Sequence, residues 1–290
     1  MYAHPEYLME TDALAEQLDD PKLRIFDCTV FLTPQADGTM EITSGEEHWR
    51  KGHVPGAGFL DLAADFSDPG SPLRFTMPEP NAFADAAGKA GIGDDRRVVL
   101  YCAGPPMWAT RMWWMLRAMG FDNAAILNGG WHKWQAEGRT VSTQATPYSP
   151  ATFTARPRKG LFADKETVEA ALGSEETCIV DSLTPQMYRG EVSIAARAGH
   201  ITGAINIPAM ALSDPENHTL LSPDDLRAAL KDTGADDGKK VITYCGGGIA
   251  ATQDAFALAL LGHDDVAVYD GSMSEWAADP DTPMKTGETP

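Results

Sequence analysis

The residues best suited to chemistry are a cysteine and the small residues that follow it. The loop after Cys245 consists of Gly246, Gly247, Gly248, Ile249 and Ala250. Consecutive glycines can adopt positive φ, which turns their N–H groups toward one point and forms a site for an anion. Together with a helix N-terminus, such a site lowers the pKa of a thiol from about 8.5 toward neutrality. We therefore expect Cys245 to be a nucleophile whose thiolate or persulfide is held by these amides.

The elements around Cys245 should place it at the edge of a sheet. Short β-branched segments alternate with helical patterns, which is typical of parallel strands joined by helices. These segments span residues 97–100, 240–243 and 266–269. We expect helices at Asp224–Lys231, capped by Ser222, and at Ile249–Leu261. Since ligands bind at the carboxyl ends of parallel strands, Cys245 lies where a ligand is expected. Alternatively, its glycines form an ordinary turn and Cys245 is a small buried apolar residue.

The chain contains one internal repeat. Residues 109–134 align without a gap on residues 251–276, at a constant offset of 142 (109 to 251, 134 to 276). Upstream, GHVPGA at 52–57 matches GHITGA at 199–204, and VVLYC matches VITYC. A repeat of this length predicts two domains with the same order of elements.

Length and composition agree with a pair of globular domains. The chain has 290 residues, of which 43% are hydrophobic and 22% are charged, and a domain commonly takes ~150 residues. We predict an α/β fold of two domains, each a mainly parallel sheet flanked by helices. The first should span residues 1–141 and the second residues 160–290. The linker is expected at 142–159, where Thr, Ser and Pro accumulate.

Charge and cysteine spacing exclude several classes of partner. The net charge is −19 and no Lys/Arg cluster is present, so nucleic acid is not an expected partner. The cysteines stand singly, without the spacing of a metal site, so no metal is predicted. They are Cys28, Cys102, Cys178 and Cys245. No apolar run is long enough to span a bilayer and the N-terminus does not resemble a secretory signal, so we expect a cytoplasmic protein with no membrane partner.

The corresponding loop of the first half differs in chemistry. Residues 102–108 read CAGPPMW, one residue longer than the loop at Cys245. Pro105 and Pro106 have no N–H to donate, so this loop cannot form the same cradle. We therefore do not expect Cys102 to be a second nucleophile.

With two GHxxGA motifs, a cysteine after a strand in each half and a DGxxxW-like close, the chain resembles the tandem-domain rhodanese-like sulfurtransferases. The resemblance covers nearly the whole chain. It implies a catalytically silent first domain and a six-residue active-site loop at Cys245–Ala250. It also implies that sulfur passes from thiosulfate or 3-mercaptopyruvate to Cys245 and then to cyanide, a thiol or a thioredoxin-like dithiol, with no cofactor. Gly247 and Ala250 stand where family members that favour mercaptopyruvate have hydroxyl residues, so the loop does not decide between the donors.

The resemblance also suggests residues for substrate binding. Arg189 and Arg197 lie in a segment similar to the family's substrate-binding arginines, and a guanidinium suits an anionic donor. Asp61 matches an aspartate that reaches the active site from the first domain. The alternatives are structural ion pairs for the arginines and a helix cap for Asp61.

Other features favour structural roles or exclude other functions. His53 and His200 occupy equivalent places in the repeat, which favours a hydrogen-bonding role in the GHxxGA turn over a Cys–His pair. The Met- and Trp-rich segment 107–119 is expected to be a buried helix or a contact between the domains. A cysteine-dependent phosphatase would need Arg at position 251, where this chain has Ala. A non-catalytic rhodanese-like binding or regulatory module is the remaining alternative.

Overall fold

The chain folds as two α/β halves with the same strand order. The computed structural model describes residues 1–35, 40–145, 147–231, 233–235 and 238–290. The first sheet has the order β1 (Leu8–Met9), β7 (Ala124–Leu127), β6 (Arg97–Tyr101), β2 (Leu23–Asp27) and β5 (Gly58–Phe59). The second has the order β11 (Ile205–Asn206), β9 (Thr177–Asp181), β12 (Lys240–Tyr244), β13 (Val266–Tyr269) and β8 (Phe162–Ala163). All neighbouring strands of both sheets are parallel, which confirms the predicted fold class.

The central strands of each sheet are apolar because both of their faces are covered. The sequences RVVLY in β6 and KVITY in β12 are buried after their first residue, as expected for parallel strands between two layers of helices. In register, Tyr101 pairs with Asp27 and Tyr244 with Asp181. Cys102 and Cys245 therefore follow equivalent strands at equivalent edges.

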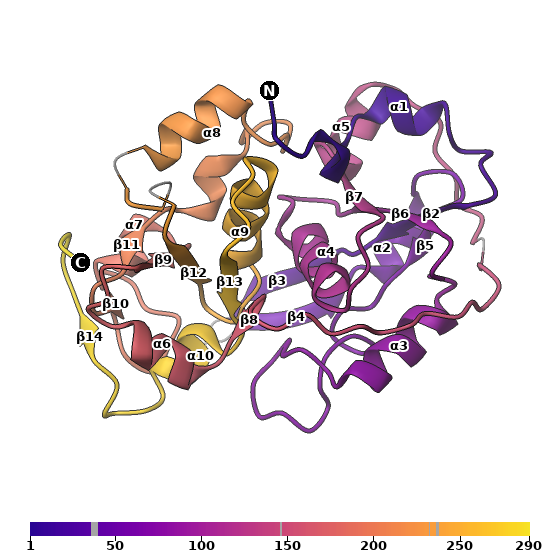
Figure 1. Ribbon diagram of the computed structural model, residues 1–290. Coiled ribbons are helices and arrows are strands. Elements are labelled where there is room, and N and C mark those ends of the chain that lie inside the picture. Colours follow the sequence, from indigo (N-terminus) through magenta and orange to yellow (C-terminus); the bar gives the residue numbers. More distant parts are fainter. Residues whose placement is uncertain (36–39, 146, 232, 236–237) are drawn as a thin grey trace.

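Helices cover both sheets, and two of them lie between the halves (Figure 1). The first half contains α1 (Thr11–Ala15), α2 (Glu46–Lys51), α3 (Pro80–Lys89), α4 (Met107–Ala118) and α5 (Gly130–Ala136). The second contains α6 (Lys165–Ala171), α7 (Pro185–Tyr188), α8 (Pro223–Leu230), α9 (Ala251–Leu260) and α10 (Ser272–Trp276). Helix α4 packs on β6 and β7, α9 packs on β12 and β13, and α4 and α9 face each other.

The two central helices explain the unusual composition of segment 107–119. All ten residues of α9 are buried, and α4 is buried almost all round. Side chains of both helices belong to one hydrophobic core that crosses between the halves. This confirms the expectation of a buried helix at a contact between the domains.

Helix ends follow from local capping. Helix α8 begins one residue earlier than predicted, and the amide of Asp225 donates to Ser222 Oγ over 3.2 Å. Helix α9 begins two residues later than predicted, so Ile249 and Ala250 belong to the loop after Cys245. Gly262 has φ +92° just beyond its end, where a left-handed residue commonly ends a helix.

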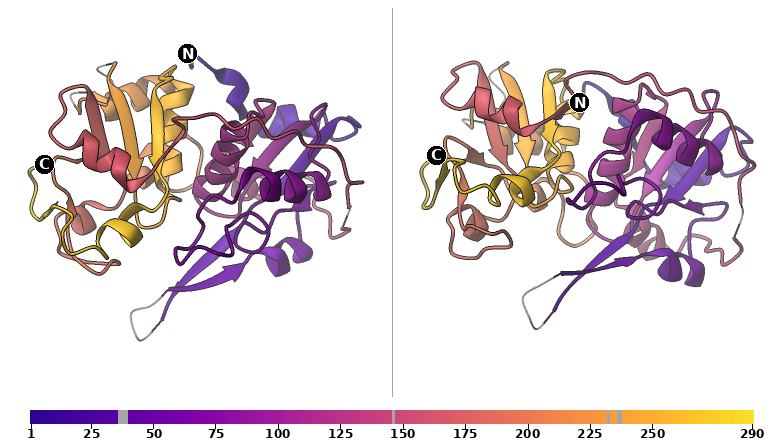
Figure 2. Two further views of the ribbon diagram at one scale, coloured as in Figure 1. Left: turned by 60° about the horizontal axis from the view of Figure 1, so that its bottom comes forward. Right: turned by 90° about the horizontal axis from the view of Figure 1, so that it is seen from below.

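Two further segments connect the halves. The ribbon of β3 (Val30–Pro34) and β4 (Met40–Ser44) leaves the first sheet and extends toward the second half (Figure 2). Near the N-terminus, the amides of Ala3 and His4 donate to the carbonyl of Leu260, and the Tyr2 hydroxyl donates to that of Leu221 over 2.6 Å. In the part of the chain that the structure describes, no helix is long and apolar enough to cross a membrane.

The remaining elements are short. A two-stranded sheet pairs β10 (His200–Ile201) with β14 (Met284–Lys285). The 3₁₀ helices are η1 (Pro5–Tyr7) and η2 (Ala209–Leu212). The predicted linker, residues 142–159, runs between the halves without a helix or strand among its described residues.

Candidate active site

The loop after β12 is held by the segment that begins α10. The Cys245 carbonyl accepts from the amide of Met273 over 3.0 Å, and the Gly246 carbonyl accepts from the amide and hydroxyl of Ser274 over 2.9 and 2.7 Å. Of the three glycines, only Gly248 has positive φ, at +73°. The expectation that several consecutive glycines adopt positive φ is therefore wrong, because one left-handed residue suffices to turn this loop.

Ser272 fixes the two ends of the glycine run. Its hydroxyl accepts from the amides of Cys245 and Gly248 over 3.1 and 3.0 Å and donates to the carbonyl of Tyr269 over 2.8 Å. Ser272 has φ +48°, whereas the equivalent Gly130 of the first half has φ +52°. A serine pays a conformational penalty in this region that glycine avoids. The penalty is offset here by a buried hydroxyl that binds both amides.

The electrostatics at Cys245 combine two opposing effects. Burial raises the pKa of the thiol above its ordinary value. Hydrogen bonds from the amides of Ala251, Gly247, Ile249 and Gly248 lower it, but by less. The amides converge on the sulfur as the sequence predicted. The expected fall of the pKa toward neutrality is nevertheless wrong. Removal of the thiolate from water is more unfavourable than the amide hydrogen bonds are favourable.

A cavity of about 490 Å³ opens at Cys245 between the halves. Its walls are largely apolar and include Leu32, Met40 and Ile42 of the β3–β4 ribbon, Trp108 of the first half and Ile194 of the second. Among the described residues that line it, the one charged side chain is Arg74. Arg74 is exposed, and its Nη1 donates to the carbonyl of Met40 over 3.2 Å.

The equivalent loop of the first half presents different groups to its cysteine. The sulfur of Cys102 lies 3.1 Å from the carbonyl oxygen of Pro105 and 3.7 Å from that of Gly104. Burial raises the pKa of Cys102 to about 12, and the charge of Asp27 adds to the rise, while hydrogen bonds from the amides of Ala109, Gly104 and Trp108 oppose it. The expectation that this loop offers no comparable set of amides is therefore only partly correct. Cys102 is not among the residues that line the cavity at Cys245.

The two arginines predicted to bind substrate lie away from this cavity. The Arg189 guanidinium pairs with the Glu191 carboxylate at 2.7 Å. Arg197 donates to the carbonyls of Trp276, Ala277, Asp279 and Thr282 and to the Thr282 hydroxyl. Its guanidinium thereby ties down the chain after α10. The structure brings neither arginine to the wall of the cavity, and the contacts of Arg197 are those of a structural residue.

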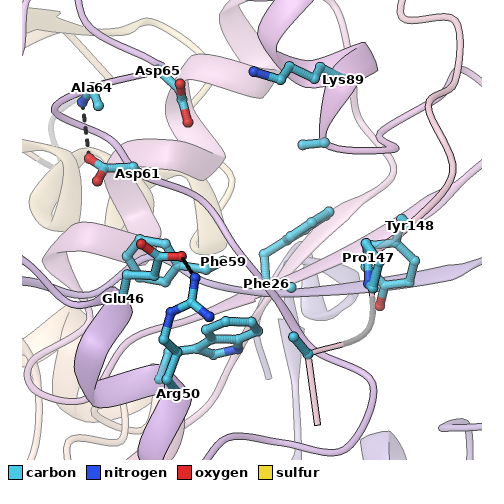
Figure 3. A pocket seen from close by; sticks show the side chains of 14 residues that line it. Phe26, Glu46, Arg50, Phe59, Asp61, Ala64, Asp65, Lys89, Pro147 and Tyr148 are labelled. Atoms are coloured by element: carbon cyan, nitrogen blue, oxygen red, sulfur yellow. Dashed lines mark hydrogen bonds and ion pairs between the residues drawn. The ribbon is translucent and has the colours of Figure 1, made fainter.

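Asp61 lies in another cavity, of about 430 Å³, within the first half. Figure 3 shows Asp61 on the same side of this pocket as Asp65 and Phe59, with Lys89 and Tyr148 on the opposite side. Its Oδ1 accepts from the amides of Ala63 and Ala64 over 3.1 and 3.0 Å. Residues 62–65 form a turn and not a helix, so the carboxylate closes a turn and is not the helix cap named as the alternative. Asp61 does not line the site of Cys245.

The histidines fix turns, as the repeat predicted. His53 Nδ1 lies 2.7 Å from the carbonyl oxygen of Trp49, and its ring stacks on that indole. His200 Nδ1 lies 2.8 Å from the carbonyl oxygen of Tyr188, and its ring stacks on that phenol. Both histidines are fully buried. His200 is therefore occupied as a structural residue of the GHITGA turn.

Three residues at or beneath the loop were missed by sequence reasoning: Arg74, Arg111 and Ser272. Ser272 carried a signal, because the aligned repeat places it opposite Gly130. Arg111 lay within the apolar segment of α4, where a charge is unexpected and calls for a partner. Arg74 carried no signal, since nothing in its neighbourhood marks it as near Cys245. Among the described residues, no group of three or more His, Cys, Asp or Glu side chains is placed to hold a metal ion.

Comparison with known families matches the chain twice to the rhodanese-like domain, over residues 10–137 and 164–279. The chain belongs to the rhodanese-like family. It is 33% identical to thiosulfate sulfurtransferase of Rattus norvegicus, over 97% of this chain and 96% of that one. It is 32% identical to 3-mercaptopyruvate sulfurtransferase of Escherichia coli K12, over 96% and 98% of the two chains.

A solved structure of this rhodanese-like family supports the same conclusion. The crystal structure titled as a 3-mercaptopyruvate sulfotransferase from Escherichia coli superposes with a TM-score of 0.82 at 32% identity. The superposition covers 93% of this chain and 99% of the other. The predicted resemblance and the assignment as a sulfurtransferase are confirmed at this level. The donor, the persulfide, the acceptor and the roles of individual residues are proposals.

Proposed function

We propose that this sulfurtransferase carries sulfur on Cys245. The observation that supports the proposal best is the convergence of the main-chain amides of Ala251, Gly247 and Ile249 on the Cys245 sulfur, at the wall of a cavity between the halves. Such amides stabilise negative charge on sulfur without reorganisation during the reaction. We propose further that the catalytic domain is 160–290, the silent domain 1–141 and the linker 142–159, in a cytoplasmic protein.

The first half-reaction loads the cysteine. The Cys245 thiolate attacks the outer sulfur of the donor, and a new S–S bond forms. With thiosulfate, the S–S bond of the donor breaks and sulfite leaves with the electron pair. With 3-mercaptopyruvate, the C–S bond breaks and pyruvate leaves after taking up a proton. The loop amides then face the outer sulfur of a Cys245 persulfide, the atom that carries negative charge.

The second half-reaction transfers the outer sulfur from the Cys245 persulfide to an acceptor. An acceptor thiolate or cyanide attacks the outer sulfur of the persulfide, and the bond between the two sulfurs breaks. The electron pair returns to Cys245, whose thiolate is again held by the loop amides. A dithiol acceptor of the thioredoxin-like class would release the sulfur as hydrogen sulfide by forming its own disulfide. No metal or cofactor takes part in this scheme.

Arg74 replaces Arg189 and Arg197 in our proposal for donor binding. An anionic donor that approaches a chain of net charge −19 needs a local cation. Arg74 lies at the cavity and is exposed, whereas Arg189 is already paired with Glu191. The planar guanidinium of Arg74 suits two oxygens of a sulfonate or carboxylate group.

Intact-mass spectrometry tests the proposal. Incubation of the full chain with thiosulfate or 3-mercaptopyruvate should add the mass of one sulfur atom, and thiol treatment should remove it. Cys245→Ser should gain no mass, while Cys102→Ser should gain the same mass as the wild type. Labelling that is lost in Cys102→Ser and kept in Cys245→Ser would overturn the choice of cysteine. A wild type that gains no mass with either donor would overturn the persulfide itself.

A further inference from the structure

Arg111 lies on α4 of the first half and reaches the loop of the second. Its side chain is fully buried. Nη1 lies 2.7 Å from Asp270 Oδ1 and donates to the carbonyl of Gly248 over 3.2 Å, while Nη2 donates to the carbonyl of Phe75 over 2.5 Å. The guanidinium carbon also lies 4.9 Å from the centre of the Phe162 ring. The charge is paired with Asp270 and both terminal nitrogens have partners, although the buried Nε has none, so these contacts hold the guanidinium in one place.

The repeat shows that this arrangement is not required by the fold. The hydroxyls of Thr110 and Thr252 are 2.8 Å apart where α4 meets α9, and the offset of 142 relates these two residues to each other. The residue that follows each threonine is also related by the repeat. These residues are Arg111 and Gln253, and both are fully buried. Helices α4 and α9 thus place these two residues at equivalent positions, but one residue is charged and the other is neutral.

The partners of these two residues differ in the same way. Gln253 Nε2 donates to the carbonyl of Ala209 in its own half over 2.7 Å. The counterpart of Asp270 is the neutral Asn128. Asp270 also accepts from the amide of Met77 over 2.7 Å, so its two oxygens bind groups of the first half. A charged pair is therefore built at the Cys245 loop, whereas the equivalent residues Gln253 and Asn128 are neutral and bind other partners.

The contact with Gly248 acts directly on the orientation of a peptide group. The carbonyl of Gly248 and the N–H of Ile249 belong to one planar trans peptide, so they point in opposite directions. Arg111 holds the carbonyl on one side, and the Ile249 amide is one of those that bind the Cys245 sulfur. Because Asp270 neutralises the guanidinium at short range, orientation of this peptide outweighs any net charge as the effect of Arg111.

We infer that Arg111 is a positioning residue for the reaction of the other half: it binds the Gly248 carbonyl and so turns the Ile249 N–H toward Cys245. This inference rests on the proposed role of Cys245 as sulfur carrier. The first half would then contribute to the reaction, because its side chain orients one of the amides that bind Cys245 in the second half.

The test compares Arg111→Gln, Arg111→Lys and Gln253→Met in the full chain. Alkylation of Cys245 by iodoacetamide is followed against pH by peptide mass spectrometry, and kcat/KM is measured with thiosulfate.

In Arg111→Gln the Gly248 peptide group loses its contact with the guanidinium, so the pH profile of alkylation should move about one pH unit upward. Alkylation below the midpoint should then be about tenfold slower. Arg111→Lys keeps the positive charge but lacks the two terminal nitrogens of the guanidinium. Its alkylation profile should therefore move by a smaller amount than that of Arg111→Gln. Gln253→Met removes a buried hydrogen bond at the related position and should match the wild-type profile.

The outcomes separate the inference from the proposed function. A folded Arg111→Gln with an unmoved profile overturns the inference, and so does an equal shift in Gln253→Met, which would mean general damage to the core. If Arg111→Gln does not fold, an unmoved profile in Arg111→Lys overturns it instead. A wild type that gains no sulfur from any donor overturns the proposed function, while a shifted alkylation profile in Arg111→Gln would still establish the positioning role.

Discussion

The two equivalent cysteines both receive hydrogen bonds from main-chain amides, and they differ in the carbonyl oxygens that face the sulfur of Cys102. At Cys245 the groups around the sulfur are amides, which stabilise a thiolate or persulfide. At Cys102 the amides of Ala109, Gly104 and Trp108 are joined by the carbonyl oxygen of Pro105, which lies 3.1 Å from the sulfur and accepts from the protonated thiol. A hydrogen bond to the neutral form of an acid opposes ionisation. One strand, loop and helix frame therefore gives the two sulfurs different sets of hydrogen-bond partners.

A second difference lies in what supports each loop. The backbone of residue 272 and that of residue 130 adopt nearly the same left-handed φ, at +48° and +52°. The Cys245 side uses serine there and gains a hydroxyl for two loop amides. The other half uses glycine, where a Cβ would lie 2.6 Å from the Cys102 carbonyl oxygen. The duplicated backbone is thus preserved at this position, while only the Cys245 side carries a hydroxyl there.

The largest predicted difference is in the reactivity of the two cysteines toward iodoacetamide. With a pKa of about 12, roughly a thousandth of Cys102 is ionised at pH 9. Since burial raises the pKa of Cys245 as well, its alkylation should become faster as pH rises through neutrality and should not level off near pH 7. Site-resolved mass spectrometry between pH 6 and 10 measures both rates. Equal labelling of the two residues would contradict the comparison.

Gly248→Ala should lower kcat/KM by about a hundredfold, the scale on which catalysis falls when one oxyanion donor is lost. Residue 248 has φ +73°, and an added Cβ would meet the Asp270 carbonyl oxygen at 2.8 Å and Arg111 at 3.2 Å. The loop must then move and carry its amides away from the sulfur. Gly104→Ala is the matched control in the other loop, since a Cβ there meets nothing within 4 Å. A Gly104→Ala variant as impaired as Gly248→Ala would break the comparison.

Arg74→Gln should raise KM for thiosulfate by about tenfold, because a charge-assisted hydrogen bond contributes about 1.5 kcal/mol or more. Arg189→Gln removes the same charge outside the cavity and should change KM by less than about twofold. Steady-state kinetics at constant ionic strength compares the two variants. A larger rise in KM for Arg189→Gln than for Arg74→Gln would instead indicate that Arg189 binds the donor.

The smallest effect expected is at Ser272. Both Ser272→Gly and Ser272→Ala remove the hydroxyl that binds the Cys245 and Gly248 amides, and each should lower kcat/KM by about fivefold. Ser272→Gly also relieves the left-handed φ, so its unfolding free energy should exceed that of Ser272→Ala by about 1 kcal/mol. Urea unfolding measures this difference. Unequal activities in the two variants would show that strain, and not the hydroxyl, supports the loop.

The repeat and the strand patterns were sufficient to predict the fold and the position of Cys245. Alternation of β-branched segments with helices depends on local sequence, and equivalent motifs in the halves fixed their common order. The structural role of His200 could also be predicted from the repeat. Its counterpart His53 lies in the half whose loop contains Pro105 and Pro106, so a histidine at this position is not specific to the Cys245 loop. These predictions succeeded because each depended on neighbours in the chain or on the offset between the copies.

The rest depends on contacts between residues far apart in sequence. Arg74 and Arg111 reach the site from the first half, and no spacing rule links either to Cys245. The raised pKa of Cys245 reflects burial by both halves, which the glycine motif does not reveal. Arg197 looked suited to an anion, but its guanidinium is taken by carbonyls after α10. Residue type indicates which partners a side chain can bind, whereas only the fold determines which partner is near.

The crossing of the N-terminal segment onto the second half affects how this protein is made. Tyr2 bonds to Leu221, which is synthesised 219 residues later. At the usual 5–20 residues per second, a ribosome needs roughly 10 to 40 s to cover that distance. Helix α9 begins at Ala251, 144 residues after α4 begins at Met107. For roughly 7 to 29 s the apolar face of α4 therefore has no α9 to pack against, and a chaperone can bind it. The contacts of the N-terminus and of α4 with the second half can therefore form only after most of the chain has been synthesised.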